Sequence, residues 1–523
     1  MLGETRGGEP DPPADERRLA GRLRQLGEDR FSDADELLGR DDRAGTDDME
    51  SGAESVAALL ALDEPELGQR AQVAVDRRER RLEERAELVR ADLAAVGDRE
   101  EHAQAAGERR VFASFFGGSI EGRGHRVSGC LGERTGYPSS PKTRRREPVG
   151  DTALVRISAI RLRRLRVPLE PPFPAAWDPV PRTEFPVTVV RVETDEGVTG
   201  HGSGDTMDGF EAFEHLFIGE DPLAIARHVR VLETIDFHAG RYWPLEAALW
   251  DIAGRVAGVP VASLFGGASD GLPAYASCGM LLPAAERAES ALRLRDEGFR
   301  ALKIRVDPRR LDEGLAAVTA TRAAVGDSMA IMVDLNQGWR MAGDITPSID
   351  VTAAREIAAR LADEGVLWLE EPLAGTDLRG LASLRAAGLG IRIAGGEMTR
   401  THHEALAALE ADAFDVYQQD VVLAGGMLRN RTLAELVLAR GRWFTPHTWT
   451  NGLGLLANLH VAAGVGGGPF IEFPYDPPGW TPERRDAFLA EPIRPDADGI
   501  LHVPAAPGLG AALDDVSIRR YAA

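Results

Sequence analysis

Hydrophobic spacing divides much of the 523-residue chain into a repeating series of short strands and longer helices. From about residue 272, apolar runs of strand length alternate with stretches in which apolar residues recur every three or four positions. In 350–362 and 377–388 this recurrence places the apolar side chains on one face of a helix, and Asp377 is the predicted N-cap of the second helix. The predicted strands are 274–278, 301–306, 330–335, 366–369, 391–394, 415–419, 443–445 and 469–473.

This alternation predicts an α/β fold in which the strands form a TIM-type (β/α)7β barrel over residues 272–494. The alternative is an open, doubly wound sheet. Such a sheet usually carries a glycine-rich phosphate loop after its first strand, and the sequence has none at that position.

The preceding region, 152–271, has a different pattern. The runs 153–168 and 185–193 are apolar and rich in β-branched residues, and the sequence 194–197 predicts a hairpin turn. Residues 245–256 have helical spacing, and Gly258 is the predicted end of that helix. The pattern therefore predicts a small α+β domain.

Residues 1–151 are rich in Arg, Asp, Glu, Ala and Gly. Val, Ile, Leu and Phe together make up less than about a fifth of this segment, a composition typical of disorder. We predict a charged, disordered or extraneous extension, in which 69–101 is a solvated helix.

Composition narrows the class of protein. A net charge of −22 and a pI of about 5.1 argue against a nucleic-acid partner. No apolar run reaches the roughly 18 residues that a membrane span needs, and 1–15 lacks the pattern of a signal peptide. The two cysteines, Cys130 and Cys278, provide neither a disulfide framework nor a zinc spacing. We therefore predict a cytoplasmic protein.

Lysine is rare in this chain, and its placement is informative. The only two lysines are Lys142 and Lys303, and Lys303 stands inside a predicted strand. Lysine is compact and can release its proton, whereas arginine does neither, so we expect Lys303 to have a chemical role. Arg305 follows two residues later and is expected on the same face of the strand.

Polar side chains gather where the predicted strands end, which is the catalytic edge of a barrel. A single carboxylate there is often a helix cap, and a single histidine is often structural. Together they would face one another across the barrel mouth, where so much unpaired negative charge is costly. Oxygen ligands of this kind predict a bound Mg²⁺ rather than Zn²⁺. These residues are Asp334, Glu370, Glu371, Glu397, Asp420, His447 and Glu472.

With these residues in this order, the stretch 152–523 resembles the enolase superfamily, in its mandelate racemase subgroup and close to acid-sugar dehydratases. The resemblance implies that 152–271 is a capping domain to which the C-terminal segment 495–523 returns. It also implies a homo-oligomer. By the same resemblance the Mg²⁺ ligands are Asp334, Glu370 and Glu397, whereas Glu371 does not bind the metal directly.

The resemblance also assigns catalytic roles. His447 and Asp420 match a His–Asp dyad, in which His447 takes the proton next to a carboxylate and Asp420 orients the ring. Lys303 matches the first lysine of a Lys-x-Lys motif. Lys303 and a protonated Glu472 are expected to stabilise the enediolate that forms. Asn336, and Trp177 in the loop 171–179, are expected to bind the substrate.

Arg305 is the one departure from the two-base racemases of this subgroup, which have a second lysine there. An arginine stays protonated and is a poor base, so we expect acid–base chemistry on one face of the carbon only. The prediction is therefore dehydration of a sugar acid to a 2-keto-3-deoxy acid, with Arg305 binding or polarising the substrate.

Three alternatives remain open at this stage. The first is a racemase or epimerase of a 2-hydroxy acid. The second is a non-catalytic barrel that binds a ligand. The third is a zinc hydrolase, which would favour histidine ligands, whereas only His447 stands at a predicted strand end.

Overall fold

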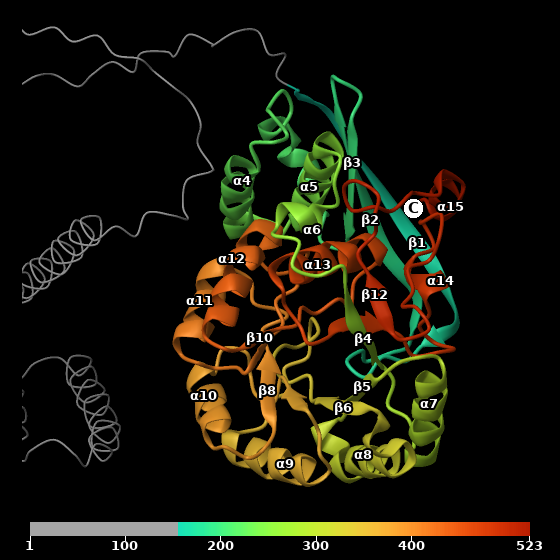
Figure 1. Cartoon of the computed structure of the whole chain (residues 1–523), viewed down its shortest axis with the longest axis vertical. Helices are drawn as coiled ribbons and strands as arrows, with labels where there is room; N and C mark the ends of the chain where they lie inside the picture. The colour runs from blue at the N-terminus through green and yellow to red at the C-terminus, as the bar shows by residue number, and fades with distance from the viewer. Residues whose placement is uncertain (1–154) are drawn as a thin grey trace, which may run out of the picture. The chain divides into compact units, whose positions relative to one another are not determined.

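The computed structural model describes residues 155–523, so the predicted extension 1–151 lies outside the described residues. All eight predicted barrel strands are present, and several are shorter than expected (Figure 1). They are β4 (Gly271–Ser277), β5 (Ala301–Arg305), β6 (Ala330–Asp334), β7 (Trp368–Glu370), β8 (Arg392–Gly395), β9 (Val416–Tyr417), β10 (Trp443–Phe444) and β11 (Ile471–Pro474).

The strands pair in parallel in chain order from β4 to β10, and β11 pairs with β4. The seventh and eighth strands meet through Gly468, whose N–H donates to the Phe444 carbonyl at 2.9 Å. The sheet therefore curls round until its two end strands approach each other at Gly468, and the predicted (β/α)7β fold is confirmed.

Seven helices connect these strands and surround the barrel (Figure 1). Asp350 and Asp377 cap two of them by accepting from the backbone N–H three residues on, at 2.9 Å each, as predicted for Asp377. The helices are α7 (Ala284–Asp296), α8 (Leu311–Val325), α9 (Val351–Asp363), α10 (Leu378–Ala386), α11 (His402–Glu410), α12 (Gly426–Ala439) and α13 (Gly452–Val465).

Alternation along β5 places apolar side chains on its outer face and the charged side chains on its inner face. On β5, Leu302 and Ile304 belong to the large core between strands and helices, whereas Ala301 belongs to the small cluster inside the barrel. Lys303 and Arg305 therefore also point inward, as predicted, and both are buried. The inner cluster fills one end of the barrel and leaves the carboxyl ends of the strands to the polar groups.

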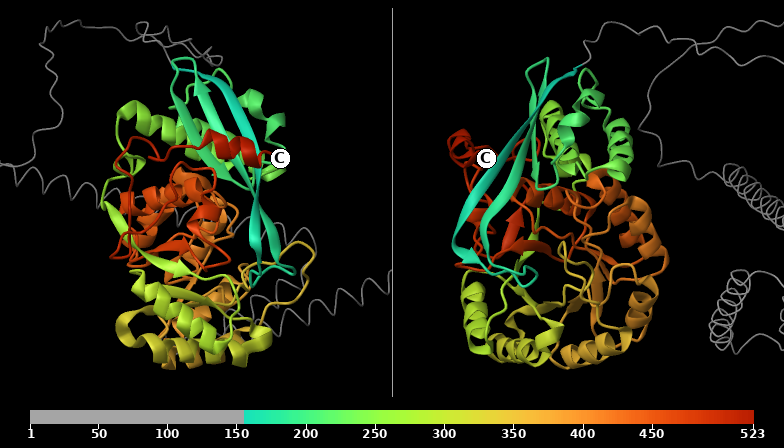
Figure 2. Two further views of the ribbon diagram at one scale, coloured as in Figure 1. Left: turned by 90° about the vertical axis from the view of Figure 1, so that its right-hand side faces the viewer. Right: turned by 180° about the vertical axis from the view of Figure 1, so that it is seen from behind.

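The region before the barrel contains an antiparallel sheet of β1 (Ile157–Phe173), β2 (Arg182–Thr194) and β3 (Thr199–Gly204). The predicted turn between β2 and β3 is present, and Gly197 in it has a φ of 80°. Strands β1 and β2 run from this sheet along the side of the barrel (Figure 2). The loop that joins them, 174–181, reaches the barrel mouth, because the Ala176 N–H donates to the Gly279 carbonyl at 2.8 Å.

Helices α4 (Ile225–His238), α5 (Trp243–Ala257) and the short α6 (Val261–Leu264) complete this region. The predicted helix end is correct: Gly258 caps α5 in the left-handed conformation. Helix α5 packs on the sheet so closely that a Cβ at Gly202 would lie 2.1 Å from the Pro244 carbonyl oxygen. Predicted strands and helix thus form one α+β layer with its own apolar core.

Helix α14 (Pro482–Arg485) follows β11, and the C-terminal segment contains β12 (Ile500–His502) and α15 (Asp515–Tyr521). Strand β12 pairs with β4, and the Ala523 N–H donates to the Arg164 carbonyl of β1 at 3.0 Å. The segment therefore contacts both the barrel and the smaller sheet, while the domain boundaries at 151/152, 271/272 and 494/495 stay predictions. Among residues 155–523, no helix is both long and apolar enough to cross a bilayer.

Candidate active site

Three buried carboxylates meet at the mouth of the barrel. Asp334 ends β6, Glu370 ends β7, and Glu397 follows β8. One oxygen from each lies within 4.8 Å of the others, and each residue is at most 2% exposed. The Glu397 Oε2 atom is buried without a hydrogen-bond donor. An all-oxygen set with an unsatisfied buried oxygen fits a hard divalent cation.

Local structure fixes the direction of two of these carboxylates. Asp334 accepts from the Asn336 backbone N–H at 2.7 Å, and Asn336 itself has a φ of 47°. Glu370 accepts from the Trp368 indole at 3.1 Å and from the Gln418 amide at 2.7 Å. Both acids are therefore held before any ligand arrives.

Lys303 lies at the centre of the negative charge. Its Nζ donates to Glu370, and lies 2.7 Å from Glu472 Oε1 and 3.6 Å from Asp334 Oδ2. The side chain is fully buried. Lys303 therefore neutralises part of the carboxylate cluster from the floor of the site.

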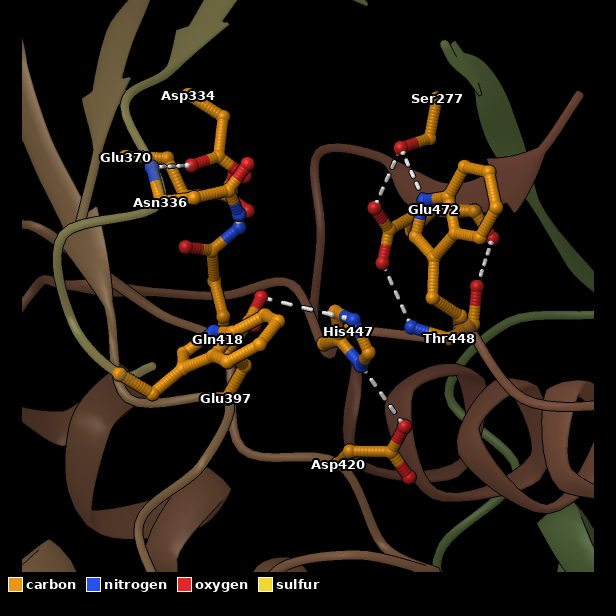
Figure 3. Close-up of polar contacts among 12 residues, drawn as sticks. Ser277, Asp334, Asn336, Glu370, Glu397, Gln418, Asp420, His447, Thr448 and Glu472 are labelled. Carbon is orange, nitrogen blue, oxygen red and sulfur yellow. Dashed lines mark hydrogen bonds and ion pairs between the residues drawn. The ribbon is translucent and has the colours of Figure 1, made fainter. Parts of the chain in front are cut away.

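Glu472 on β11 is held on the opposite side of the mouth from the triad (Figure 3). It accepts from the Ser277 hydroxyl at 2.7 Å and from the Thr448 backbone N–H at 2.6 Å. Although burial opposes its ionisation, the charges of Lys303, His447 and Arg305 lower the pKa of Glu472 to about 2. The three surrounding cations therefore favour an ionised Glu472, whereas the expected role in stabilising the enediolate calls for the protonated form.

His447 and Asp420 form the predicted dyad, with His447 Nδ1 3.0 Å from Asp420 Oδ2 (Figure 3). The other Asp420 oxygen accepts from the Asn458 amide at 3.0 Å and from the Val422 N–H at 2.9 Å. His447 Nε2 faces the triad and lies 3.5 Å from Glu397 Oε2. The ring is therefore oriented with one nitrogen on Asp420 and the other toward the site.

The charges around His447 favour its protonated form. Burial favours the neutral ring, but the carboxylates of Glu397, Glu472 and Asp420 outweigh it and raise the pKa of His447 to about 10. Neutralisation of the triad by a cation would weaken the largest of these attractions, because Glu397 is one of its members. The dyad and the triad are thus electrostatically linked.

Arg305 and Trp177 form the other wall. The Arg305 guanidinium contacts Asp334 and donates to the Cys278 carbonyl at 3.2 Å. It also lies 4.9 Å from the centre of the Trp177 ring and 5.9 Å from that of Trp449. The loop that carries Trp177 therefore brings an aromatic ring to the predicted site, beside Arg305.

Glu371 lies next to the triad but is not part of it. Its backbone has a φ of 45°, and its buried Oε2 has no hydrogen-bond partner. Burial and the neighbouring Glu397 and Glu370 raise the pKa of Glu371 well above its ordinary value. Its exclusion from the ligand set stays a prediction of the family resemblance.

Several contacting residues were not predicted from the sequence. They come from loops or from positions without a charge, so neither strand periodicity nor charge pattern marks them. For Trp339, Trp368, Gln418, Thr448 and Trp449 the available signal was a polar or aromatic residue within five positions of a strand-end carboxylate or of His447, whereas Ser277 and Asn458 had no such signal. These residues are Ser277, Trp339, Trp368, Gln418, Thr448, Trp449 and Asn458.

Comparison with known proteins agrees with this fold and site. Residues 159–266 match the family model described as "Mandelate racemase / muconate lactonizing enzyme, N-terminal domain". Residues 286–517 match the model described as "Enolase C-terminal domain-like". The two matches correspond to the smaller α+β region and to most of the barrel.

Two curated relatives align over most of their length. D-galactarolactone cycloisomerase of Agrobacterium fabrum is 29% identical over 388 residues, which cover 70% of this chain and 99% of the relative. Arabinonate dehydratase of Saccharolobus solfataricus is 30% identical over 284 residues, 53% of this chain and 70% of the relative. Related sequences thus include both a cycloisomerase and a dehydratase.

Solved structures give the same result. L-talarate dehydratase of Polaromonas sp. JS666, solved with Mg and L-glucarate, has a TM-score of 0.61 at 26% identity, covering 71% of this chain and 98% of that one. A racemase of Streptomyces coelicolor with bound magnesium has a TM-score of 0.60 at 29% identity, covering 70% and 100%. The chain belongs to the enolase superfamily, in its mandelate racemase subgroup.

Proposed function

We propose that the chain is a magnesium-dependent sugar-acid dehydratase, which converts a sugar acid to a 2-keto-3-deoxy acid. The observation that carries this proposal is the pairing of one oriented base, His447, with an arginine at the position across the site. The relatives include dehydratases, which supports the reaction class. The substrate is a small carboxylate, and we expect a cytoplasmic homo-oligomer.

Magnesium, predicted from the sequence, is the cofactor. Solved relatives contain it, and the buried acidic triad is present here. We assign Asp334, Glu370 and Glu397 as its ligands. When bound, Mg²⁺ would act as a Lewis acid toward the substrate carboxylate and stabilise the added negative charge of the enediolate.

The chain's own groups supply the proton chemistry. His447, in its neutral form, takes the α-proton through Nε2, and Asp420 holds the ring and stabilises the imidazolium that results. Lys303 donates hydrogen bonds toward the carboxylate end of the substrate, where charge develops. The ionised Glu472 keeps Lys303 in place through their 2.7 Å contact.

Loss of the β-hydroxyl completes the reaction. The imidazolium of His447 returns its proton to the departing hydroxyl, so that water leaves and an enol remains that becomes the 2-keto acid. Arg305, a permanent cation, binds the substrate and cannot take a proton from the opposite face. Asn336 and Trp177 line the same side of the mouth and are proposed to contact the substrate.

The test is a screen of the purified protein with Mg²⁺ against a library of sugar acids, in which 2-keto acids are detected with semicarbazide. A product that disappears in a His447→Asn variant would support the dehydratase. Exchange of solvent deuterium into both epimers of a substrate, without loss of water, would establish the racemase or epimerase instead. Absence of both turnover and exchange with every carboxylate tested would leave a ligand-binding barrel.

A further inference from the structure

The three carboxylates of the triad are held to different degrees. Asp334 contacts Lys303, Arg305 and a backbone N–H, and Glu370 contacts Lys303, Trp368 and Gln418. Glu397 has one hydrogen-bond donor among the described residues, the Trp339 indole. The Trp339 Nε1–H donates to Glu397 Oε1 at 2.5 Å. Apart from the 3.5 Å contact between its Oε2 and His447 Nε2, the direction of Glu397 therefore depends on this one hydrogen bond.

Trp339 belongs to the long connection 335–350 between β6 and α9. The connection begins directly after Asp334, and Asn336 turns the chain there with a positive φ of 47°. The loop thus contacts two proposed ligands: it begins after Asp334, and five residues later its Trp339 holds Glu397, which follows another strand. Connections longer than about 12–15 residues without secondary structure are usually either functional or disordered linkers.

The loop has a defined shape, which is what a positioning role requires. The Arg340 guanidinium donates to the Asn336 carbonyl at 3.0 Å, the Trp339 carbonyl at 2.8 Å and the Thr346 carbonyl at 2.9 Å. A Cβ at Gly338 would lie 2.2 Å from Glu371 Oε1, so any larger residue would have to displace the Glu371 side chain where the loop crosses the mouth. One arginine therefore ties the two ends of the loop together around Trp339.

The other side of the loop faces the substrate side of the mouth. A cavity of about 170 Å³ is lined by Trp339 and Arg340 from the loop and by Trp177 and Arg305 from the opposite wall. The same loop therefore contacts Glu397 and lines this cavity.

We propose that Trp339 is a positioning residue that keeps Glu397 Oε1 occupied and turns Oε2 toward the cation. This inference rests on the proposed Mg²⁺ site. It follows that cation binding and order of the loop 335–350 stabilise each other, since both depend on the Trp339–Glu397 hydrogen bond. Cation binding should then also stabilise the wall of the substrate cavity that this loop forms.

The test compares Trp339→Phe with two other variants of the same change. Trp443→Phe is the matched control. Trp443 lies at the start of β10, and the Arg392 guanidinium stacks 4.0 Å from the centre of its ring. Trp368→Phe also removes an indole donor from the triad, but Glu370 keeps Gln418 and Lys303. Mg²⁺ affinity is measured by calorimetry without substrate, and the thermal midpoint is measured without metal.

We expect Trp339→Phe to weaken Mg²⁺ binding by about 10- to 100-fold, the usual effect of removing a hydrogen-bond partner of a metal ligand. The metal-free midpoint should match that of Trp443→Phe. Trp368→Phe should show the reverse order, a lower midpoint and a smaller loss of affinity, because Trp368 is fully buried. Hydrogen exchange of 335–350 should slow with Mg²⁺ in the wild type and not in Trp339→Phe.

Arg340→Ala provides a second route if Trp339→Phe does not fold, since it loosens the loop without touching Glu397. It should also weaken Mg²⁺ binding. Unchanged affinity in either variant, or an equal loss in Trp443→Phe, would overturn the positioning role. Failure of the wild-type protein to bind any divalent cation would instead contradict the proposed function itself, so the two failures can be told apart.

Discussion

At the scale of single residues, the dyad can be tested without removing its base. Asp420→Asn keeps an oxygen for the His447 Nδ1–H but removes a negative charge that helps raise the pKa of His447. Because His447 must be neutral to accept a proton, the rate rises with pH through that pKa. Asp420→Asn should move this limb of the kcat/KM profile to lower pH.

The same variant should lower the plateau rate by about 10²- to 10⁴-fold, because a weaker base takes the proton less readily. The pH dependence of kcat/KM measures both effects in one experiment. A profile that falls in height without moving along the pH axis would assign Asp420 only to holding the ring.

Arg305 permits the opposite kind of test, a gain of function. Arg305→Lys would place a side chain that can lose its proton on the face opposite His447, close to the positive charge of Lys303. We expect the variant to exchange the α-proton of the epimer that the wild type leaves untouched, by at least about tenfold over wild type. Proton NMR in deuterated water measures this exchange. Exchange of both epimers by the wild type would show that Arg305 does not enforce one-face chemistry.

At the scale of elements, helix α13 of the barrel contacts both α6 of the smaller α+β region and the C-terminal segment 495–523. Its fully buried His460 accepts from the Ala262 N–H at 3.0 Å through Nδ1 and contacts the Leu509 carbonyl at 3.2 Å through Nε2. Burial lowers the pKa of His460 from 6.5 to about 4. The folded protein therefore holds this ring neutral in a pH range where the unfolded chain protonates it.

The sign of the pH effect follows from that difference. The contribution of His460 to stability is fully present above pH 6.5 and is lost as the pH falls through 4, by about 3 kcal/mol in total. His460→Gln cannot titrate, so it should be less stable than wild type at pH 7.5 and should lose less stability on acidification. Urea titrations at pH 7.5 and 5.0 measure both differences. Equal acid-induced losses in the two proteins would contradict the assignment.

The helices and strands were predictable because the local spacing of apolar residues determines them. The site residues were predictable where they stand at the carboxyl ends of strands. Strand alternation places Lys303 and Arg305 inward, and chain order alone brings Asp334 and Glu370 to one edge of the sheet. Contacts made by loops had no such signal. Trp339 reaches Glu397 across 58 positions, and the hydrogen bond depends on the path of the loop.

Charge state was the other quantity that the sequence could not provide. The ionisation of Glu472 depends on how closely Lys303, His447 and Arg305 approach it, and sequence spacing does not specify these distances. Strand lengths were overestimated for a related reason. Apolar positions continue past the last paired residue, as at Val306 after β5 and Leu335 after β6, although the strand ladder has already ended.

At the scale of the whole molecule, the smaller α+β region completes the barrel mouth. Its Ser203 hydroxyl contacts Asn451, four residues after His447, and its Arg241 donates to the Leu423 carbonyl at 2.9 Å, three residues after Asp420. The loop 174–181 closes the other side with Trp177 on Arg305. Residues of both the barrel and the smaller α+β region therefore form the mouth.

Cation binding should consequently stabilise the entire chain. The triad places three carboxylates within 4.8 Å, and Lys303 and Arg305 offset only part of that charge. Mg²⁺ at 100 times its dissociation constant adds about 2.7 kcal/mol to the free energy of unfolding if it binds the folded state alone. Thermal melts with Mg²⁺ and with EDTA should therefore differ by a measurable rise in midpoint.

Glu397→Gln should abolish most of this rise while raising the midpoint in EDTA, because it removes one of the repelling charges. A variant that keeps the full Mg²⁺ response would show that the stabilising ion binds elsewhere than at the triad.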